Sequence, residues 1–165
     1  MARAKPDFGS LKVWRGRFGE PARPAVCVSL FAANDPESSA AALAQVRKKL
    51  PWGERPLAGA LSLREDRGDR TAQWVEAAGQ GFFRDFAHVV LVGPPARAAL
   101  RRILKAPSPG PTAFSCLSNP APEALMRHIL AAVGGEPVVV GLGNIVGPGE
   151  RVVDYWQDRG SPYDH

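Results

Sequence analysis

Residues that could bind an anionic ligand gather at three places in this chain of 165 residues, each just after an apolar segment. They are Asn34, Asp35 and Ser38, then Arg64, Asp66, Arg67 and Arg70, and finally Gly143 and Asn144. Arginine binds carboxylates and phosphates through paired hydrogen bonds, and the first backbone N–H groups of a helix also favour anions. The residue types therefore indicate a site for carboxylate or phosphate groups.

The first of these places lies where a buried strand should meet a helix. Residues 25–31 are apolar apart from Ser29, which is typical of a buried strand. Pro36 suits the first turn of a helix, and Asp35 before it is a good N-cap for a helix that reaches about Leu50. In an open α/β sheet such a junction is where ligands bind. The alternative is that Asp35 is only a cap.

The second place is a charged segment, residues 64–71, directly behind a predicted strand at 57–63. Arg64, Arg67 and Arg70 recur every three residues, and Asp69 is predicted to cap a helix that runs to Ala78. An exposed, solvated turn is the alternative. The density of charge behind a buried strand favours a binding role instead.

Strands and helices alternate along the rest of the chain. Further strands are predicted at 88–92, 112–117 and 137–141, and further helices at 96–104, 123–133 and 150–157. This pattern predicts an α/β fold, with a Rossmann-like, mostly parallel sheet of five or six strands and helices on both faces. The sixth strand would be an edge strand at 11–14.

The predicted organisation is an N-terminal extension at 1–24, a single α/β domain at 25–158 and a flexible tail at 159–165. Because the carboxyl ends of parallel strands meet at one edge of a sheet, Asn34, Arg67 and Asn144 should share that edge.

Composition argues against several classes of function. The net charge is +5 without a run of five basic residues, so no nucleic-acid partner is expected. Cys27 and Cys116 lack the spacing of metal ligands and are expected to be buried thiols, and no metal site is predicted. His88 stands alone and is expected to be structural. The sequence has neither a long apolar run nor a signal peptide, which predicts a cytoplasmic protein.

Nucleotide-binding motifs are also lacking. None of the five lysines follows a glycine, so the chain contains no P-loop, and the glycines at 141, 143 and 147 do not have dinucleotide-binding spacing. Taken alone, the residues indicate a ligand-binding α/β domain without a complete catalytic machine.

Three segments together resemble a known family. FAANDPES at 31–38, REDRGDRTAQ at 64–73 and VVGLGNIVGPGE at 139–150 are similar, in order and spacing, to motifs of the poly-γ-glutamate synthase catalytic subunit of the CapB/PgsB type. The similarity begins near Gly9 and covers nearly the whole chain. It concerns the C-terminal domain of that subunit, which belongs to the Mur ligase superfamily.

The resemblance implies a part in an ATP-dependent amide ligase, in which ATP phosphorylates a carboxylate and an amine attacks the acyl phosphate. This domain would close over ATP and receive the acceptor amino acid. ATP and Mg²⁺ would be supplied mainly by a separate Mur-type ATPase domain or chain, without which this chain should not be catalytically complete. The nine residues named at the outset would bind nucleotide, phosphates or the acceptor carboxylate, and no catalytic residue is assigned.

The implied substrate is an acidic amino acid or another anion. The implied setting is capsule synthesis, where partners could link a cytoplasmic domain to a membrane-bound synthase complex. A second hypothesis remains open from the sequence: a non-catalytic ligand-binding or regulatory module derived from the same fold.

Overall fold

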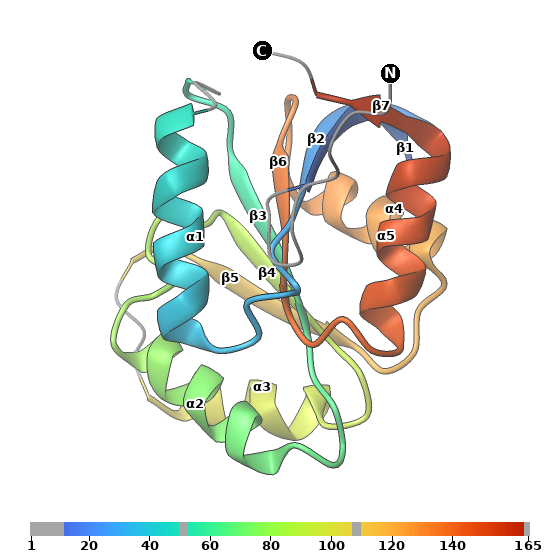
Figure 1. The fold of residues 1–165 in the computed structure, drawn as a ribbon. Helices are drawn as coiled ribbons and strands as arrows, with labels where there is room; N and C mark the ends of the chain where they lie inside the picture. The colour runs from blue at the N-terminus through green and yellow to red at the C-terminus, as the bar shows by residue number, and fades with distance from the viewer. Residues whose placement is uncertain (1–11, 50–52, 107–109, 164–165) are drawn as a thin grey trace, which may run out of the picture.

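The computed structural model describes residues 12–49, 53–106 and 110–163, which form seven strands and five helices (Figure 1). The strands are β1 (Lys12–Phe18), β2 (Arg23–Ser29), β3 (Leu57–Ser62), β4 (His88–Val92), β5 (Ala113–Leu117), β6 (Val138–Gly143) and β7 (Gly160–Pro162). The helices are α1 (Pro36–Lys49), α2 (Gly68–Gly79), α3 (Ala96–Lys105), α4 (Pro122–Ala132) and α5 (Pro148–Arg159).

All seven strands belong to one sheet, with the order β5-β4-β3-β6-β2-β1-β7. The five strands from β5 to β2 are parallel, and β1 and β7 run antiparallel to their neighbours. The predicted α/β class and the Rossmann-like, mostly parallel sheet are confirmed.

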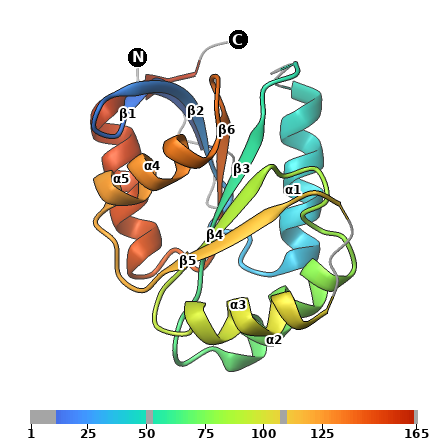
Figure 2. The ribbon, with the colours of Figure 1, turned by 180° about the vertical axis from the view of Figure 1, so that it is seen from behind.

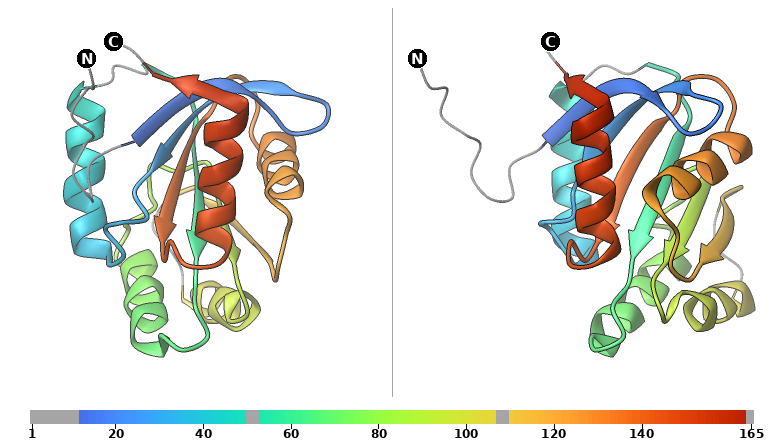
Figure 3. Two further views of the ribbon diagram at one scale, coloured as in Figure 1. Left: turned by 45° about the vertical axis from the view of Figure 1, so that its right-hand side comes forward. Right: turned by 90° about the vertical axis from the view of Figure 1, so that its right-hand side faces the viewer.

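Helices cover both faces of this sheet, and Figures 1 to 3 show α1 and α5 on opposite sides of it. Successive strand residues point to opposite faces, so Val26 and Val28 join one core while Cys27 joins the other. The first core is closed by α1, α2 and α3, which bury side chains such as Trp74. The second is closed by α4 and α5, which bury side chains such as Trp156. Among the described helices, none is long and apolar enough to cross a bilayer.

The two ends of the chain differ from the prediction. β1 spans residues 12–18, so it is longer than the edge strand predicted at 11–14. It lies inside the sheet between β2 and β7, so these residues belong to the domain's sheet and not to an N-terminal extension. Residues 160–162 form β7, so a flexible tail is wrong for them. Gly16 and Gly160 allow this pairing, because a Cβ on Gly16 would lie 2.9 Å from the Gly160 Cα. Leu11 and residues 164–165 lie outside the described residues.

Both cysteines lie in strands as expected and are free thiols, but their burial differs. Cys27 is buried in the centre of the sheet, and burial raises the pKa of its thiol well above the usual value. Cys116 is only partly buried because β5 is an edge strand. The expectation of a buried thiol is therefore wrong for Cys116.

Candidate functional site

The three polar strand ends meet at the carboxyl edge of the sheet, because β2, β6 and β3 are parallel neighbours. β2 and β3 lead into α1 and α2 on one face, whereas β6 between them leads into α5 on the other. Loops that diverge in this way open a crevice at the sheet edge, where α/β proteins bind ligands. The predicted common edge for Asn34, Arg67 and Asn144 is confirmed.

The loop after β2 is fixed by the start of α1. The Ser38 backbone N–H donates to Asp35 Oδ1 at 2.8 Å, which confirms Asp35 as the N-cap. The Asn34 carbonyl accepts a hydrogen bond from Trp74 Nε1 at 3.3 Å, which ties this loop to α2. The Ser38 N–H and the positive charge of Arg70 lower the pKa of Asp35. Asp35 is therefore a carboxylate at neutral pH, as both a cap and a ligand group require.

Two of the three arginines after β3 pair with carboxylates of their own segment. Arg64 donates to Asp66 through Nε at 2.8 Å and Nη2 at 2.6 Å. Arg67 Nε lies 3.5 Å from Asp69 Oδ1. Both carboxylates are well exposed, and exposed pairs contribute little to stability. Arg64 and Arg67 are thus held at the surface of this sheet edge by carboxylates of their own segment.

The start of α2 differs from the prediction. Arg67 occupies the N-cap position without a side-chain cap, and Asp69 lies within the first turn instead of capping it. A carboxylate there still stabilises the helix by its interaction with the helix dipole.

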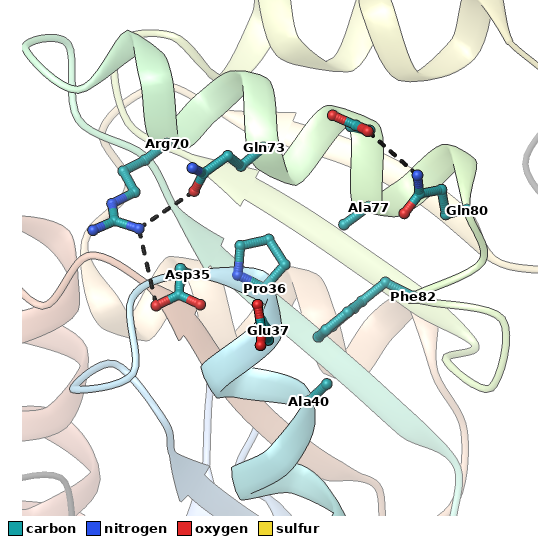
Figure 4. A pocket seen from close by; sticks show the side chains of 10 residues that line it. Asp35, Pro36, Glu37, Ala40, Arg70, Gln73, Ala77, Gln80 and Phe82 are labelled. Atoms are coloured by element: carbon teal, nitrogen blue, oxygen red, sulfur yellow. Dashed lines mark hydrogen bonds and ion pairs between the residues drawn. The ribbon is translucent and has the colours of Figure 1, made fainter.

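Arg70 is the arginine that reaches across the crevice. Its Nη1 donates to Gln73 Oε1 at 3.3 Å and lies 3.9 Å from Asp35 Oδ2, which is too long for a hydrogen bond (Figure 4). Its Nε is buried and has no hydrogen-bond partner among the described residues. A buried donor without a partner is costly. The Nη1 group carries a second N–H that Asp35 is too distant to accept, so the Arg70 guanidinium has capacity for a further acceptor.

A cavity of about 530 Å³ lies beside Arg70, between the first turns of α1 and one side of α2 (Figure 4). Its lining consists of Asp35, Pro36, Glu37, Ala40, Arg70, Gln73, Glu76, Ala77, Gln80 and Phe82. Three of these side chains are carboxylates and one is a guanidinium. The cavity with this mixed lining is named the α1–α2 pocket below.

The loop after β6, which carries Gly143 and Asn144, does not line this pocket. The Asn144 backbone N–H donates to the Ser62 carbonyl at 2.9 Å, which joins β6 to β3 beyond the ladder. Gly143, which belongs to β6, has φ +89°, and a Cβ there would fall on the same carbonyl oxygen. Asn144 is only 5% exposed, so this loop closes the end of the sheet instead of lining the α1–α2 pocket.

Several pocket residues were not predicted from the sequence. Gln73, Ala77 and Gln80 follow the predicted Arg70 at intervals of three or four residues, which places them on the same side of a helix as Arg70. This helical spacing was the sequence signal that could have identified them as pocket residues. No sequence pattern marks Glu37 and Phe82 as pocket residues, because they reach the pocket only through the packing of α1 against α2.

Metal ligands are not gathered at this edge. Across residues 12–49, 53–106 and 110–163, no group of three or more His, Cys, Asp or Glu side chains could hold a metal ion.

Comparison with known proteins gives one finding. A family model described as the poly-gamma-glutamate synthase CapB C-terminal domain matches residues 16–159, which include the three polar strand ends and most of the sheet. The search of curated proteins returned no match. The resemblance carried by the sequence motifs is confirmed over nearly the whole length of the chain. The chain therefore belongs to the poly-gamma-glutamate synthase CapB C-terminal domain family.

Proposed function

We propose that this domain binds the acceptor amino acid of an ATP-dependent amide ligase in the α1–α2 pocket, which is called the acceptor pocket from here on. In this proposal it closes over ATP and the acyl phosphate carried by a separate Mur-type ATPase domain or chain, which also supplies most of the Mg²⁺ ligands. Family membership supports a place in poly-γ-glutamate synthesis. The observation that carries the residue-level proposal is the Arg70 guanidinium, which lines the pocket, hydrogen-bonds Gln73 and lies beyond hydrogen-bond distance of Asp35.

The charges of the pocket suit an amino acid better than a polyphosphate. Asp35, Glu37 and Glu76 would repel the phosphates of ATP, but they can surround an ammonium group. Arg70, with Gln73 beside it, can bind a carboxylate through two parallel hydrogen bonds. An α-amino acid carries both groups, so the pocket matches its charge distribution.

The residues of this domain would position the nucleophile. The acceptor amine must lose a proton before it attacks the acyl phosphate, and an efficient general base has a pKa near the working pH. Since the Ser38 N–H and Arg70 lower the pKa of Asp35, this carboxylate is a weak base and would orient the ammonium group. Acyl phosphates hydrolyse readily, so closure of this domain over the reaction would exclude water.

Arg70→Ala is expected to weaken binding of L-glutamate by about 10- to 100-fold, because a hydrogen bond to a charged group contributes roughly 1.5–3 kcal/mol. Isothermal titration calorimetry measures the affinity, with ATP titrated in parallel. Thermal melts without ligand should show that the variant remains folded.

Arg97→Ala is the matched control, because Arg97 is an exposed arginine on α3 outside the pocket. Equal glutamate affinities in the wild type, Arg70→Ala and Arg97→Ala would refute the assignment of the acceptor pocket. A loss for ATP alone would move the nucleotide, instead of the acceptor, to this pocket.

The isolated chain is expected to release no phosphate from ATP above background in the presence of Mg²⁺ and glutamate, because it contains no Gly-Lys-Ser/Thr loop. A phosphate-release assay measures this, and Arg70→Ala distinguishes a contaminant from the domain itself. Turnover that disappears in Arg70→Ala would contradict the separate ATPase.

A further inference from the structure

Two of the three histidines of the chain lie against one serine, on the face of the sheet that α4 covers. His88 begins β4, Ser115 is the middle residue of β5, and His128 belongs to α4. Ser115 pairs with Val90 in the β4–β5 register, so His88, two residues earlier than Val90, points to the same face as Ser115. The fold thus unites three residues that are far apart in sequence.

The two imidazoles direct the same ring nitrogen at one point. His88 Nε2 lies 2.8 Å from Ser115 Oγ, and His128 Nε2 lies 2.9 Å from it. The ring centroids are 6.0 Å apart and the ring planes are inclined by 68°, so the rings converge without stacking. A hydroxyl carries one proton, so Ser115 donates to one imidazole and accepts from the other.

Convergent imidazole nitrogens are the protein ligands that zinc, nickel and copper ions prefer. Zinc binds histidine nitrogen at about 2.0–2.1 Å. The two nitrogens lie at hydrogen-bond distance from a single oxygen, so side-chain rotations that move this oxygen aside would leave room for one ion among the three atoms.

One member of the trio, His128, also borders an open cavity. A cavity of about 520 Å³ is lined by His128 together with Leu117, Asn119 and Arg127. It offers room for water molecules to complete a coordination shell. The positive charge of Arg127 would reduce affinity for a cation without blocking access.

We propose that His88 Nε2, His128 Nε2 and Ser115 Oγ bind a divalent transition-metal ion of the zinc class, with water from the adjoining cavity as the remaining ligands. In the bound state both imidazoles carry their proton on Nδ1 and the serine hydroxyl keeps its own, so a neutral site releases no proton. The ion links α4 to β4 and β5 and thereby stabilises this edge of the sheet. The site shares no residue with the acceptor pocket and does not depend on the proposed function.

Calorimetric titration of the tag-free full chain with ZnCl₂ tests the site. Wild type should bind a single ion. His88→Ala and His128→Ala should each weaken binding by more than about tenfold, because loss of even an outer partner of a metal ligand costs roughly 10- to 100-fold. Ser115→Ala should cause a smaller loss, since both imidazoles remain. MgCl₂ should not bind here, because Mg²⁺ prefers oxygen ligands.

His165→Ala is the matched control, since it removes the third histidine and leaves both imidazoles in place. Zn²⁺ should raise the melting temperature of wild type and of His165→Ala, but not of the two other histidine variants, because an ion that binds the folded state stabilises it. Thermal melts without metal show which variants fold. If only one of His88→Ala and His128→Ala folds, its Zn²⁺ affinity is sufficient to test the site.

Wild-type affinity in His88→Ala or His128→Ala, or loss of binding in His165→Ala alone, overturns the proposal. In that case the trio is a hydrogen-bonded junction of α4 with the sheet.

Discussion

Trp74→Ala is expected to lower the free energy of unfolding by about 3–5 kcal/mol, the usual cost of emptying a buried tryptophan site. Trp74 is 1% exposed, and its ring centroid lies 5.2 Å from that of Phe82 and 6.0 Å from that of Phe83. Its indole N–H also donates a hydrogen bond to the Asn34 carbonyl. The substitution therefore removes core volume and separates α2 from the loop that carries Asp35. Urea denaturation measures the change.

Trp74→Phe separates the two effects. It keeps most of the aromatic volume and loses the indole N–H, so it should cost less than Trp74→Ala and still weaken glutamate binding in the acceptor pocket. Leu104→Ala is the control, because Leu104 is 64% exposed and should change stability by less than about 0.5 kcal/mol. A Trp74→Ala protein as stable as the Leu104→Ala protein would contradict the packing described here.

Gly143→Ala is expected to destabilise the domain by several kcal/mol. A φ of +89° costs a non-glycine residue about 1–3 kcal/mol. The new Cβ would also fall on the Ser62 carbonyl oxygen, and forcing atoms apart in a packed interior costs about 1–3 kcal/mol more. The same shift would lengthen the hydrogen bond from the Asn144 N–H to that carbonyl. Denaturant unfolding gives the total.

Gly53→Ala isolates the conformational part of this cost. Gly53 has φ +64°, but a Cβ there would meet no atom within 4 Å. Its replacement should therefore show the backbone cost alone, and Gly143→Ala should exceed it. Equal losses at the two positions would mean that the β3–β6 contact relaxes freely.

Long apolar runs made most of the sheet predictable. The fully buried strands β3 and β6 are apolar apart from Ser62 at the end of β3, and Pro36 after Asp35 marks the start of α1. The apolar pattern of β1 is interrupted by Arg15, Gly16 and Arg17, which hides the length of the strand. Beside the short outer strand β7, Arg15 and Arg17 remain exposed and Gly16 is partly exposed. β7 has three residues, too few for any periodic signal.

The candidate site was less predictable because it depends on distances between elements. Asp35 and Arg70 could be named from their positions after strands, but their approach across the crevice required the packing of α1 against α2. Asn144 has the residue type of a ligand group, yet tertiary packing buries it. His88 looked isolated because its partners Ser115 and His128 reach it only through the register of β5 and the placement of α4.

The position of β6 has a consequence for synthesis of the chain on the ribosome. β6 lies between β2 and β3, although it is the last of the five parallel strands in sequence. Until it emerges, β1 and β2 form one half-sheet and β3, β4 and β5 another, each with an open apolar edge. About 110 residues separate Ser29 from Val138, a delay of roughly 5–20 s at typical elongation rates. Unpaired strand edges invite pairing with other chains, so the nascent domain should be a client of ribosome-associated chaperones during that interval.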